Sequence, residues 1–264
     1  MTRPGLGSPL AAFALSLAAP CLALLLTAAA PAFAQDASYR TPPAPVGDIL
    51  NAPRLPRGGP AVSPDGARMV VPVLPSLVSI AALAEPVEKL AGLEILPGLR
   101  ANRSSIKTAA TGFSIVTTAS GAKVRAQLPA EARIVKTAWS NDSHWIACAV
   151  LASGGADLWI VDAASGAARR IEGVKINSVL PASLEWSNDD AFVFCATVPA
   201  GAGAPAEASR VPRGPQLRVG TGRAAAQRTS RDVLKTAADQ ERFAWYFTSQ
   251  LAHVPVAGGA PLPI

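Results

Sequence analysis

Short polar turns alternate with short apolar runs along much of the chain, and one such unit occurs three times. Two copies read Trp139-Ser140-Asn141-Asp142-Ser143 and Trp186-Ser187-Asn188-Asp189-Asp190, each followed by an apolar run (145–150 and 191–198). A third copy, Val62-Ser63-Pro64-Asp65-Gly66, precedes the apolar residues 69–71. Asp and Asn favour tight turns because their side chains bond nearby backbone amides, and Gly adopts left-handed angles freely. Each copy is therefore predicted to be a turn that leads into a β-strand.

A second pattern repeats with nearly the same period. Predicted strands at 112–117 and 123–128 flank a turn at Ser120, and predicted strands at 158–162 and 168–171 flank a turn at Ser165. Ser120 and Ser165 are 45 residues apart, and Ser140 and Ser187 are 47 residues apart. A period near 45 with several short strands per unit is typical of a β-propeller blade. A β-sandwich and a solenoid are the alternatives.

The sequence thus predicts an all-β fold, an incomplete and unclosed β-propeller over residues 60–264 with short helical insertions. An insertion at 75–105 is expected to hold one or two short helices, because apolar residues in 76–93 recur at helical spacing. A low-complexity loop is expected at 199–230. Two helices should follow it, capped by Ser230 and Asp239, and then a strand at 251–256. Tryptophans are expected to fill the space between blades: Trp139, Trp159 and Trp186.

The first 34 residues have the pattern of a signal peptide. Arg3 precedes an apolar stretch at 10–30, and Ala32-Phe33-Ala34 forms a cleavage site before Gln35. The alternative is a transmembrane anchor, which a proline within the stretch and the small-residue exit disfavour. A lipoprotein at Cys21 is disfavoured by the preceding proline. We expect a periplasmic or secreted protein without a stable membrane anchor, with an extended Pro-rich arm at 35–59.

Charge and cysteine content narrow the choice of partners and compartments. The chain carries a net charge of +6, with several arginines at 210–231 in a segment rich in Pro, Gly and Ala. That segment contains no aromatic residues to stack on bases, so we expect a solvated loop and no nucleic acid partner. Cys148 and Cys195 occupy equivalent strand positions in neighbouring repeats. They should be too far apart for a disulfide and are predicted to be buried free thiols.

No catalytic constellation is visible, so we assign no catalytic, cofactor-binding or metal-binding residue and expect no cofactor. No serine lies in a G-x-S-x-G motif. His144 and His253 are the two histidines, and a lone histidine is more often a surface or packing residue. The turn aspartates are spaced by whole blades, which predicts that they lie far apart and serve the turns: Asp65, Asp142 and Asp189.

Four stretches resemble the prolyl oligopeptidase family, in its glutamyl-endopeptidase-like branch. The similarity begins at Tyr39-Arg40-Thr41-Pro42-Pro43 with 48–53, and continues through 83–93 and the turn at 137–142. The most specific stretch comes last: Val211-Pro212-Arg213-Gly214-Pro215, then 228–235 and 246–251. Together these stretches are spread over nearly the whole length of residues 39–264.

The resemblance implies a propeller that leads into a C-terminal α/β-hydrolase domain with a Ser, Asp and His triad. It further implies that the propeller admits only short peptides to the catalytic domain. This chain resembles only the propeller portion, so no catalytic residue is carried over and the chain alone should be inactive. The leading hypothesis is the amino-terminal portion of an exported serine peptidase, truncated before the hydrolase domain, with peptide substrates in the full-length parent. The alternatives are a stand-alone propeller that binds peptide or protein without catalysis, and a propeller completed by a separate hydrolase chain.

Overall fold

The computed structural model describes residues 41–52, 54, 60–201, 203–205, 222, 234 and 236–264. The chain divides into two compact units, 1–47 and 48–264, which are described separately. The predicted signal peptide, most of the loop at 199–230 and the helix predicted from Ser230 lie outside the described residues. Helix α2 (Ala44–Asn51) begins in the first unit and ends in the second. It is eight residues long and lies in the arm that was predicted to be extended.

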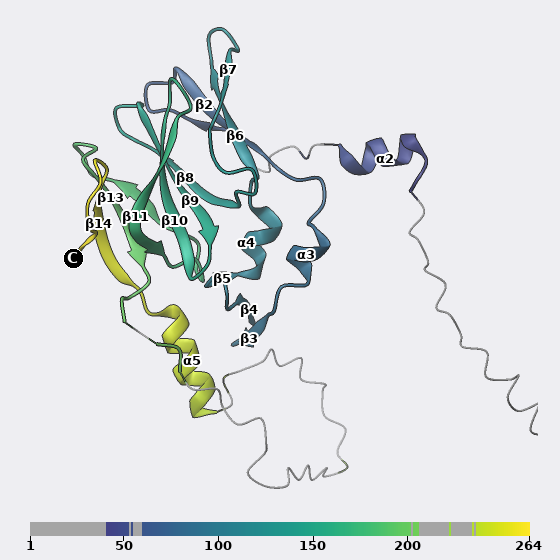
Figure 1. Ribbon diagram of the computed structural model, residues 1–264, viewed down its shortest axis with the longest axis vertical. Helices are drawn as coiled ribbons and strands as arrows, with labels where there is room; N and C mark the ends of the chain where they lie inside the picture. Colours follow the sequence, from purple (N-terminus) through teal and green to yellow (C-terminus); the bar gives the residue numbers. More distant parts are fainter. Residues whose placement is uncertain are drawn as a thin grey trace, which may run out of the picture. The chain divides into compact units, whose positions relative to one another are not determined.

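The strands of the second unit form antiparallel sheets of four, eight and three strands (Figure 1). The four-stranded sheet is one propeller blade, the eight-stranded sheet consists of two further blades, and the three-stranded sheet belongs to the insertion. Blade one has the order β1-β2-β6-β7 and consists of β1 (Ala61–Val62), β2 (Arg68–Val73), β6 (Gly112–Thr117) and β7 (Lys123–Arg125). Blade two comprises β8 (Ile134–Trp139), β9 (Trp145–Ala152), β10 (Gly155–Asp162) and β11 (Ala168–Ile176). Blade three comprises β12 (Leu184–Trp186), β13 (Phe192–Thr197), β14 (Gln250–Pro255) and β15 (Leu262–Pro263).

Backbone pairing between the strands of neighbouring blades is limited to the strand ends. Strand β11 pairs with β13 at one position, Ile176 opposite Thr197, and an isolated bridge joins Ala110 to Ile134. Within the described residues the sheets are antiparallel and do not close into a ring. The predicted class, a mostly β, unclosed propeller with few short helices, is confirmed.

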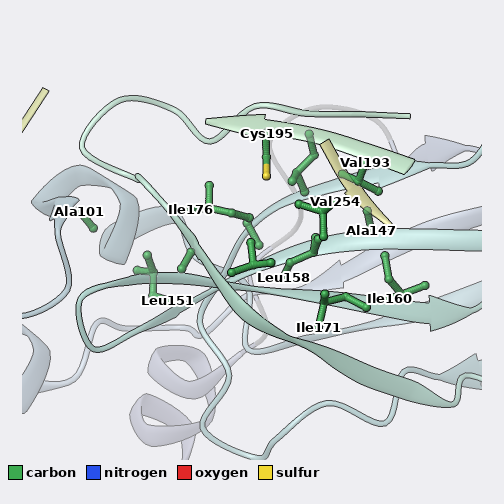
Figure 2. Close-up of a cluster of buried hydrophobic side chains, with 14 of the residues drawn as sticks. Ala101, Ala147, Leu151, Leu158, Ile160, Ile171, Ile176, Val193, Cys195 and Val254 are labelled. Carbon is green, nitrogen blue, oxygen red and sulfur yellow. The ribbon is translucent and has the colours of Figure 1, made fainter. Parts of the chain in front are cut away.

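Blade two is buried on both faces because side chains of a strand alternate between the two sides of its sheet. On β9, Ile146 and Cys148 pack in one buried cluster with Val70 and Phe113 of blade one. Ala147 and Ala149, which alternate with them, pack in a second cluster with residues of blade three. Figure 2 shows this second cluster, in which residues of β13 and β14 meet those of β10 and β11: Val193, Cys195 and Val254 with Leu158, Ile160 and Ile171. All three tryptophans expected between blades, Trp139, Trp159 and Trp186, pack against these clusters.

The insertion contains a short helix in the stretch where one or two were predicted, but it also contains a sheet that was not predicted. It contains α3 (Ile80–Leu83), then a separate three-stranded sheet of β3 (Glu88–Leu90), β4 (Leu93–Leu96) and β5 (Ala101–Asn102), and then α4 (Arg103–Thr108). The C-terminal part of the stretch 76–93, where helical spacing was expected to continue, is therefore a strand and not a helix. Ala91 and Gly92 both have positive φ, 50° and 78°, which is the geometry of a two-residue hairpin turn. Leu90 and Ile95 on the two strands are buried in one cluster, which favours this hairpin over a helix.

Helix α5 (Ala237–Phe247) lies close to its predicted position but begins differently. Thr236, not Asp239, is the N-cap, and Asp239 completes a capping box as the third helical residue. The predicted apolar face is present: Tyr246 is buried in the cluster that contains Leu90, and its hydroxyl donates to Glu88 at 2.8 Å. Helix α5 therefore docks on the insertion. None of the helices in the described residues is both long and apolar enough to cross a bilayer.

Candidate functional site

The three turns that carry the repeat have one common hydrogen-bond geometry. In each, the serine hydroxyl donates to the aspartate two residues later, with 2.6 Å between the oxygens. The same hydroxyl accepts from the backbone N–H five residues after the serine, at 2.9 to 3.0 Å. The three pairs are Ser63 with Asp65, Ser140 with Asp142, and Ser187 with Asp189. These contacts explain why serine and aspartate recur at this spacing.

The fourth residue of each turn has a left-handed backbone and a different side chain in each blade. The φ angles are 72° at Gly66, 63° at Ser143 and 55° at Asp190. A residue other than glycine is strained in this region. At the second and third turns, the side chain of this fourth residue contacts the turn of the preceding blade.

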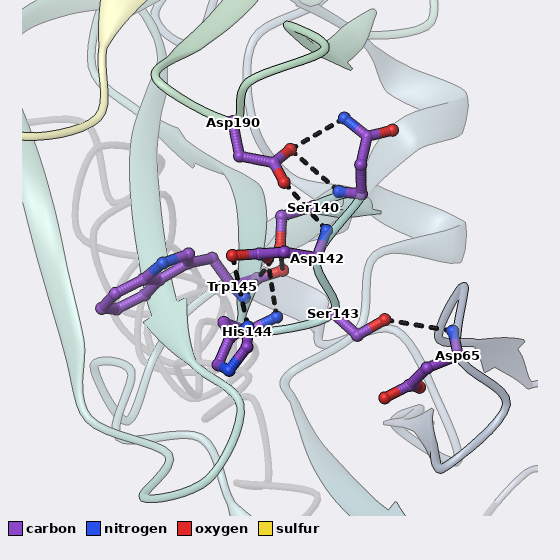
Figure 3. Close-up of polar contacts among 8 residues, drawn as sticks. Asp65, Ser140, Asp142, Ser143, His144, Trp145 and Asp190 are labelled. Carbon is purple, nitrogen blue, oxygen red and sulfur yellow. Dashed lines mark hydrogen bonds and ion pairs between the residues drawn. The ribbon is translucent and has the colours of Figure 1, made fainter.

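Asp190 makes the most extensive of these contacts (Figure 3). Its Oδ1 accepts from the backbone N–H and the side-chain amide of Asn141, both at 2.8 Å, and its Oδ2 accepts from the backbone N–H of Asp142 at 2.8 Å. The hydroxyl of Ser143 makes the corresponding contact in the preceding blade, where it accepts from the N–H of Asp65 at 3.1 Å. The turn of blade three therefore hydrogen-bonds to the turn of blade two, and the turn of blade two hydrogen-bonds to the turn of blade one.

The tryptophan before each of the last two turns adds a second repeated contact. The indole of Trp186 donates to the carbonyl of Ala138 at 3.1 Å, and the indole of Trp139 donates to the carbonyl of Ala61 at 3.0 Å. Ala61 and Ala138 are equivalent positions in the repeat. The prediction that the turns lie far apart is therefore wrong, because face-to-face packing of the blades brings the same end of each blade together.

The turn aspartates are held in their charged form by these bonds. The hydrogen bond from Ser63 lowers the pKa of Asp65, and the bond from Ser187 lowers that of Asp189. At Asp142 partial burial raises the pKa, but the bonds from Ser140 and from the His144 backbone outweigh it, so the pKa is lowered. Each carboxylate is used within its own turn. Over the described ranges, no group of three or more His, Cys, Asp or Glu side chains is placed to hold a metal ion.

The two histidines and two cysteines lie in different environments. His144 is 75% exposed and its Nδ1 lies 3.2 Å from Asp142 Oδ2. His253 lies in β14 and stacks on Phe192, with 5.0 Å between ring centroids. Cys148 and Cys195 are buried free thiols, as predicted, and burial raises the pKa of both. The structure does not bring these four residues together.

A cavity of about 840 Å³ lies beside the first strand of blade two. Three cationic residues line it, Arg54, Lys107 of α4 and Lys136 of β8, and none of the acidic residues in the described ranges does. Pro72, Leu74 and Ile134 are among its apolar lining residues. Among the described residues, none of the three cations has an ion-pair partner. The cavity is therefore suited to an anionic ligand with an apolar portion.

Sequence reasoning missed both the cavity and the contacts between turns. Arg54, Lys107 and Lys136 come from three distant segments, so no local pattern groups them. The change from Gly66 to Ser143 to Asp190 at one repeat position was a visible signal. A residue other than glycine at a left-handed turn position indicates a side chain with a specific partner.

The fold and the repeated turns define an open array of β-propeller blades, and comparison with known proteins identifies its relatives. The chain matches no sequence profile of a known protein family. It is 33% identical to a protein of Oryza sativa subsp. japonica named "Probable glutamyl endopeptidase, chloroplastic" over 228 residues, 81% of this chain and 24% of the relative. It is 29% identical to the corresponding protein of Arabidopsis thaliana over 234 residues, 83% of this chain and 24% of the relative.

These relatives confirm the resemblance to the glutamyl-endopeptidase-like branch of the prolyl oligopeptidase family. The chain spans about a quarter of the length of the relatives it matches. A crystal structure described as a dipeptidyl aminopeptidase IV of Bacteroides ovatus matches 53% of this chain and 21% of its own, at 11% identity and a TM-score of 0.32.

Proposed function

We propose that this chain is the amino-terminal propeller portion of an exported serine peptidase, truncated before its catalytic hydrolase domain. One observation carries the proposal: two glutamyl endopeptidases match more than 80% of this chain, yet the chain spans only 24% of each. The sequence from 1 to 34 supports export, with cleavage after Ala34. In the longer protein, this portion limits access to the catalytic domain and admits peptide substrates.

The cavity agrees with a role in handling acidic peptides. Its three cations lie at one concavity that no carboxylate of the described residues lines, so they attract negatively charged side chains. The relatives' name, glutamyl endopeptidase, leads us to propose peptides that contain glutamate as the substrates of the longer protein.

Peptide hydrolysis by two forms of the protein tests this function. The longest native polypeptide that contains this sequence and the chain alone are each incubated with a peptide that has one internal glutamate. The same peptide with glutamine in place of glutamate is the matched control. We expect the longer polypeptide to cleave the glutamate peptide and to lose activity after reaction with a fluorophosphonate, and the chain alone to leave both peptides intact. Serine-dependent turnover by the chain alone, or none by the longer polypeptide, would contradict the proposal.

The cavity also favours a second candidate, a stand-alone propeller that binds peptides without cleaving them. In that case, the chain alone should bind an acidic peptide, and Lys107→Ala and Lys136→Ala should each weaken binding by about fivefold to tenfold. Lys123→Ala, which removes an exposed lysine of β7 that does not line the cavity, is the control. Equal effects of all three substitutions would exclude the cavity as the binding site.

A further inference from the structure

Blade three is packed on one face, whereas blade two is packed on both. Val193, Cys195 and Val254 face blade two and are at most 2% exposed. The alternate residues of the same strands point to the other side of the sheet. Among them, Phe194 is 36% exposed and Leu251 is 62% exposed. Blade three therefore has an apolar outer face that the described residues leave uncovered.

The repeat shows what covers this face elsewhere in the same molecule. Phe194 occupies the repeat position of Ala147 in blade two, because each lies seven residues after the turn serine. Ala147 is fully buried in the cluster that blade three completes. At the corresponding place in blade two, the cover is thus another blade of the same repeat.

The turn of blade three presents the same donors as the turn of blade two. The N–H groups of Asn141 and Asp142 are bound by the Asp190 carboxylate. The equivalent N–H groups belong to Asn188 and Asp189, and no other residue in the described ranges accepts a hydrogen bond from them. Within the described ranges the Asn188 N–H therefore has no acceptor, and the Asp189 N–H contacts only the carboxylate of its own side chain. Neither donor is bound by another blade.

The first strand of blade three presents the matching acceptor. Ala61 and Ala138 each accept an indole N–H from the following blade. The equivalent carbonyl in blade three is that of Glu185, one residue before Trp186, and no described side chain donates to it. Blade three therefore presents the same three features as the surface of blade two that contacts blade three. These are an apolar face, the backbone N–H groups of the turn and a carbonyl of the first strand, at equivalent positions of the repeat.

We propose that the outer face of blade three is the docking surface for a further blade of the same repeat, in a longer polypeptide that contains this chain. That blade carries a carboxylate or hydroxyl at the fourth turn position for Asn188 and Asp189. It carries a tryptophan before its turn for the Glu185 carbonyl, and an apolar face for Phe194 and Leu251. That this blade belongs to the same longer polypeptide rests on the proposed function. The side chains that it should carry are inferred from the repeated contacts.

A second copy of this chain fits the surface less well. Its first blade has Gly66 at the fourth turn position, which has no side-chain acceptor, and Val62 in place of the tryptophan. Its second blade is already covered on both faces. A head-to-tail pair of chains would therefore lack both repeated polar contacts.

Amide hydrogen exchange at Asn188 and Asp189 tests the proposal in the longest native polypeptide and in the chain alone. We expect exchange about a hundredfold slower in the longer polypeptide, close to the rates at Asn141 and Asp142. In the longer polypeptide, Phe194→Asp should speed exchange at Asn188 and Asp189 by about tenfold or more. Ile80→Asp, at a residue that is 82% exposed and outside the blades, is the matched control and should leave it unchanged.

Fast exchange in both forms, or equal effects of the two substitutions, would overturn the docking surface. Protection that appears in the chain alone and grows with its concentration would assign the face to a second copy and also overturn it. Peptide hydrolysis measured on the same sample separates this inference from the proposed function. Hydrolysis without slow exchange at Asn188 and Asp189 would contradict the docking surface alone. Slow exchange at these residues without hydrolysis would contradict the peptidase function alone.

Discussion

The Asp190 carboxylate of blade three holds the Asp142 backbone of blade two, with 2.8 Å between Oδ2 and the amide nitrogen. The same carboxylate binds Asn141 twice. Ser143 contacts Asp65 in the equivalent way one blade earlier, but with a single hydroxyl. The hydrogen bonds between the turns are therefore stronger between blades two and three than between blades one and two.

Asp190→Gly should destabilise the chain by about 1–2 kcal/mol, because it removes three hydrogen bonds to a charged acceptor that is partly exposed. Glycine keeps the left-handed backbone, as Gly66 does at the equivalent position, so the turn can still form. The measured loss is that of the hydrogen bonds, offset in part by the backbone strain that glycine relieves. Urea unfolding gives the free energy. Ser143→Gly removes one bond and should cost about 0.5–1 kcal/mol. An equal or larger loss for Ser143→Gly would contradict the order of the two junctions.

Gly166→Ala should lower the free energy of unfolding far more than Gly121→Ala. The two glycines are equivalent in sequence, because Gly121 follows Ser120 and Gly166 follows Ser165 in the two copies of the second pattern. Both have positive φ, 74° and 70°, so alanine is strained at either position. A methyl group at Gly166 would lie 2.4 Å from the Arg125 carbonyl oxygen of blade one, whereas one at Gly121 meets nothing within 4 Å. We expect about 1 kcal/mol lost at Gly121 and about 3 kcal/mol at Gly166, measured by urea unfolding. Similar losses would show that the turn at Gly166 does not approach blade one.

Acid should destabilise the chain through its turn aspartates. The pKa values of Asp65, Asp142 and Asp189 are lowered from their ordinary value of 3.8. The unfolded chain therefore binds protons at a higher pH than the folded chain does. The stability from these groups is present above pH 3.8 and is lost as the pH falls through the folded values. Free energies of unfolding measured between pH 6 and pH 2.5 should show this fall.

Ser187→Ala provides the residue-level check on this acid dependence. It removes the hydrogen bond that contributes most to the lowered pKa of Asp189. NMR titration should show the Asp189 pKa rising toward 3.8, while that of Asp65 stays unchanged. An unchanged Asp189 titration would refute the assignment of this shift to the serine.

The two thiols of the chain from Gln35 onward should be unreactive in the folded state. Burial raises the pKa of Cys195 to about 11 and also raises the pKa of Cys148, so both are protonated and covered at pH 8. Ellman's reagent should therefore label neither in buffer and both in 8 M urea. Rapid labelling of Cys195 in buffer would show that β13 is not packed on blade two.

The blade repeat was predictable because it depends on local chemistry. A serine, an aspartate and a left-handed residue at fixed spacing form one turn, and two landmarks with nearly equal periods fix the blade. The burial of Cys148 and Cys195 followed from the same alignment. These predictions needed no knowledge of how one blade sits on another.

The errors arose where long-range packing decides. The C-terminal part of the stretch 76–93 is a strand and not a helix because Leu90 is buried against α5, whose residues are about 150 positions later in the sequence. The turns of neighbouring blades proved to be in contact, because blade packing and not sequence spacing sets the distance between Asp142 and Asp190. The cavity cations, from three separate segments, were missed for the same reason.

The most direct test of the central claim is the intact mass of the native polypeptide that contains this sequence, isolated from its cells and measured by mass spectrometry. If the chain is the propeller portion of a longer peptidase, the mass will be well above that of the 264 residues, with a hydrolase sequence on the carboxyl side of Ile264. A folded protein whose mass matches residues 35–264 would contradict this claim and favour a propeller that only binds peptides.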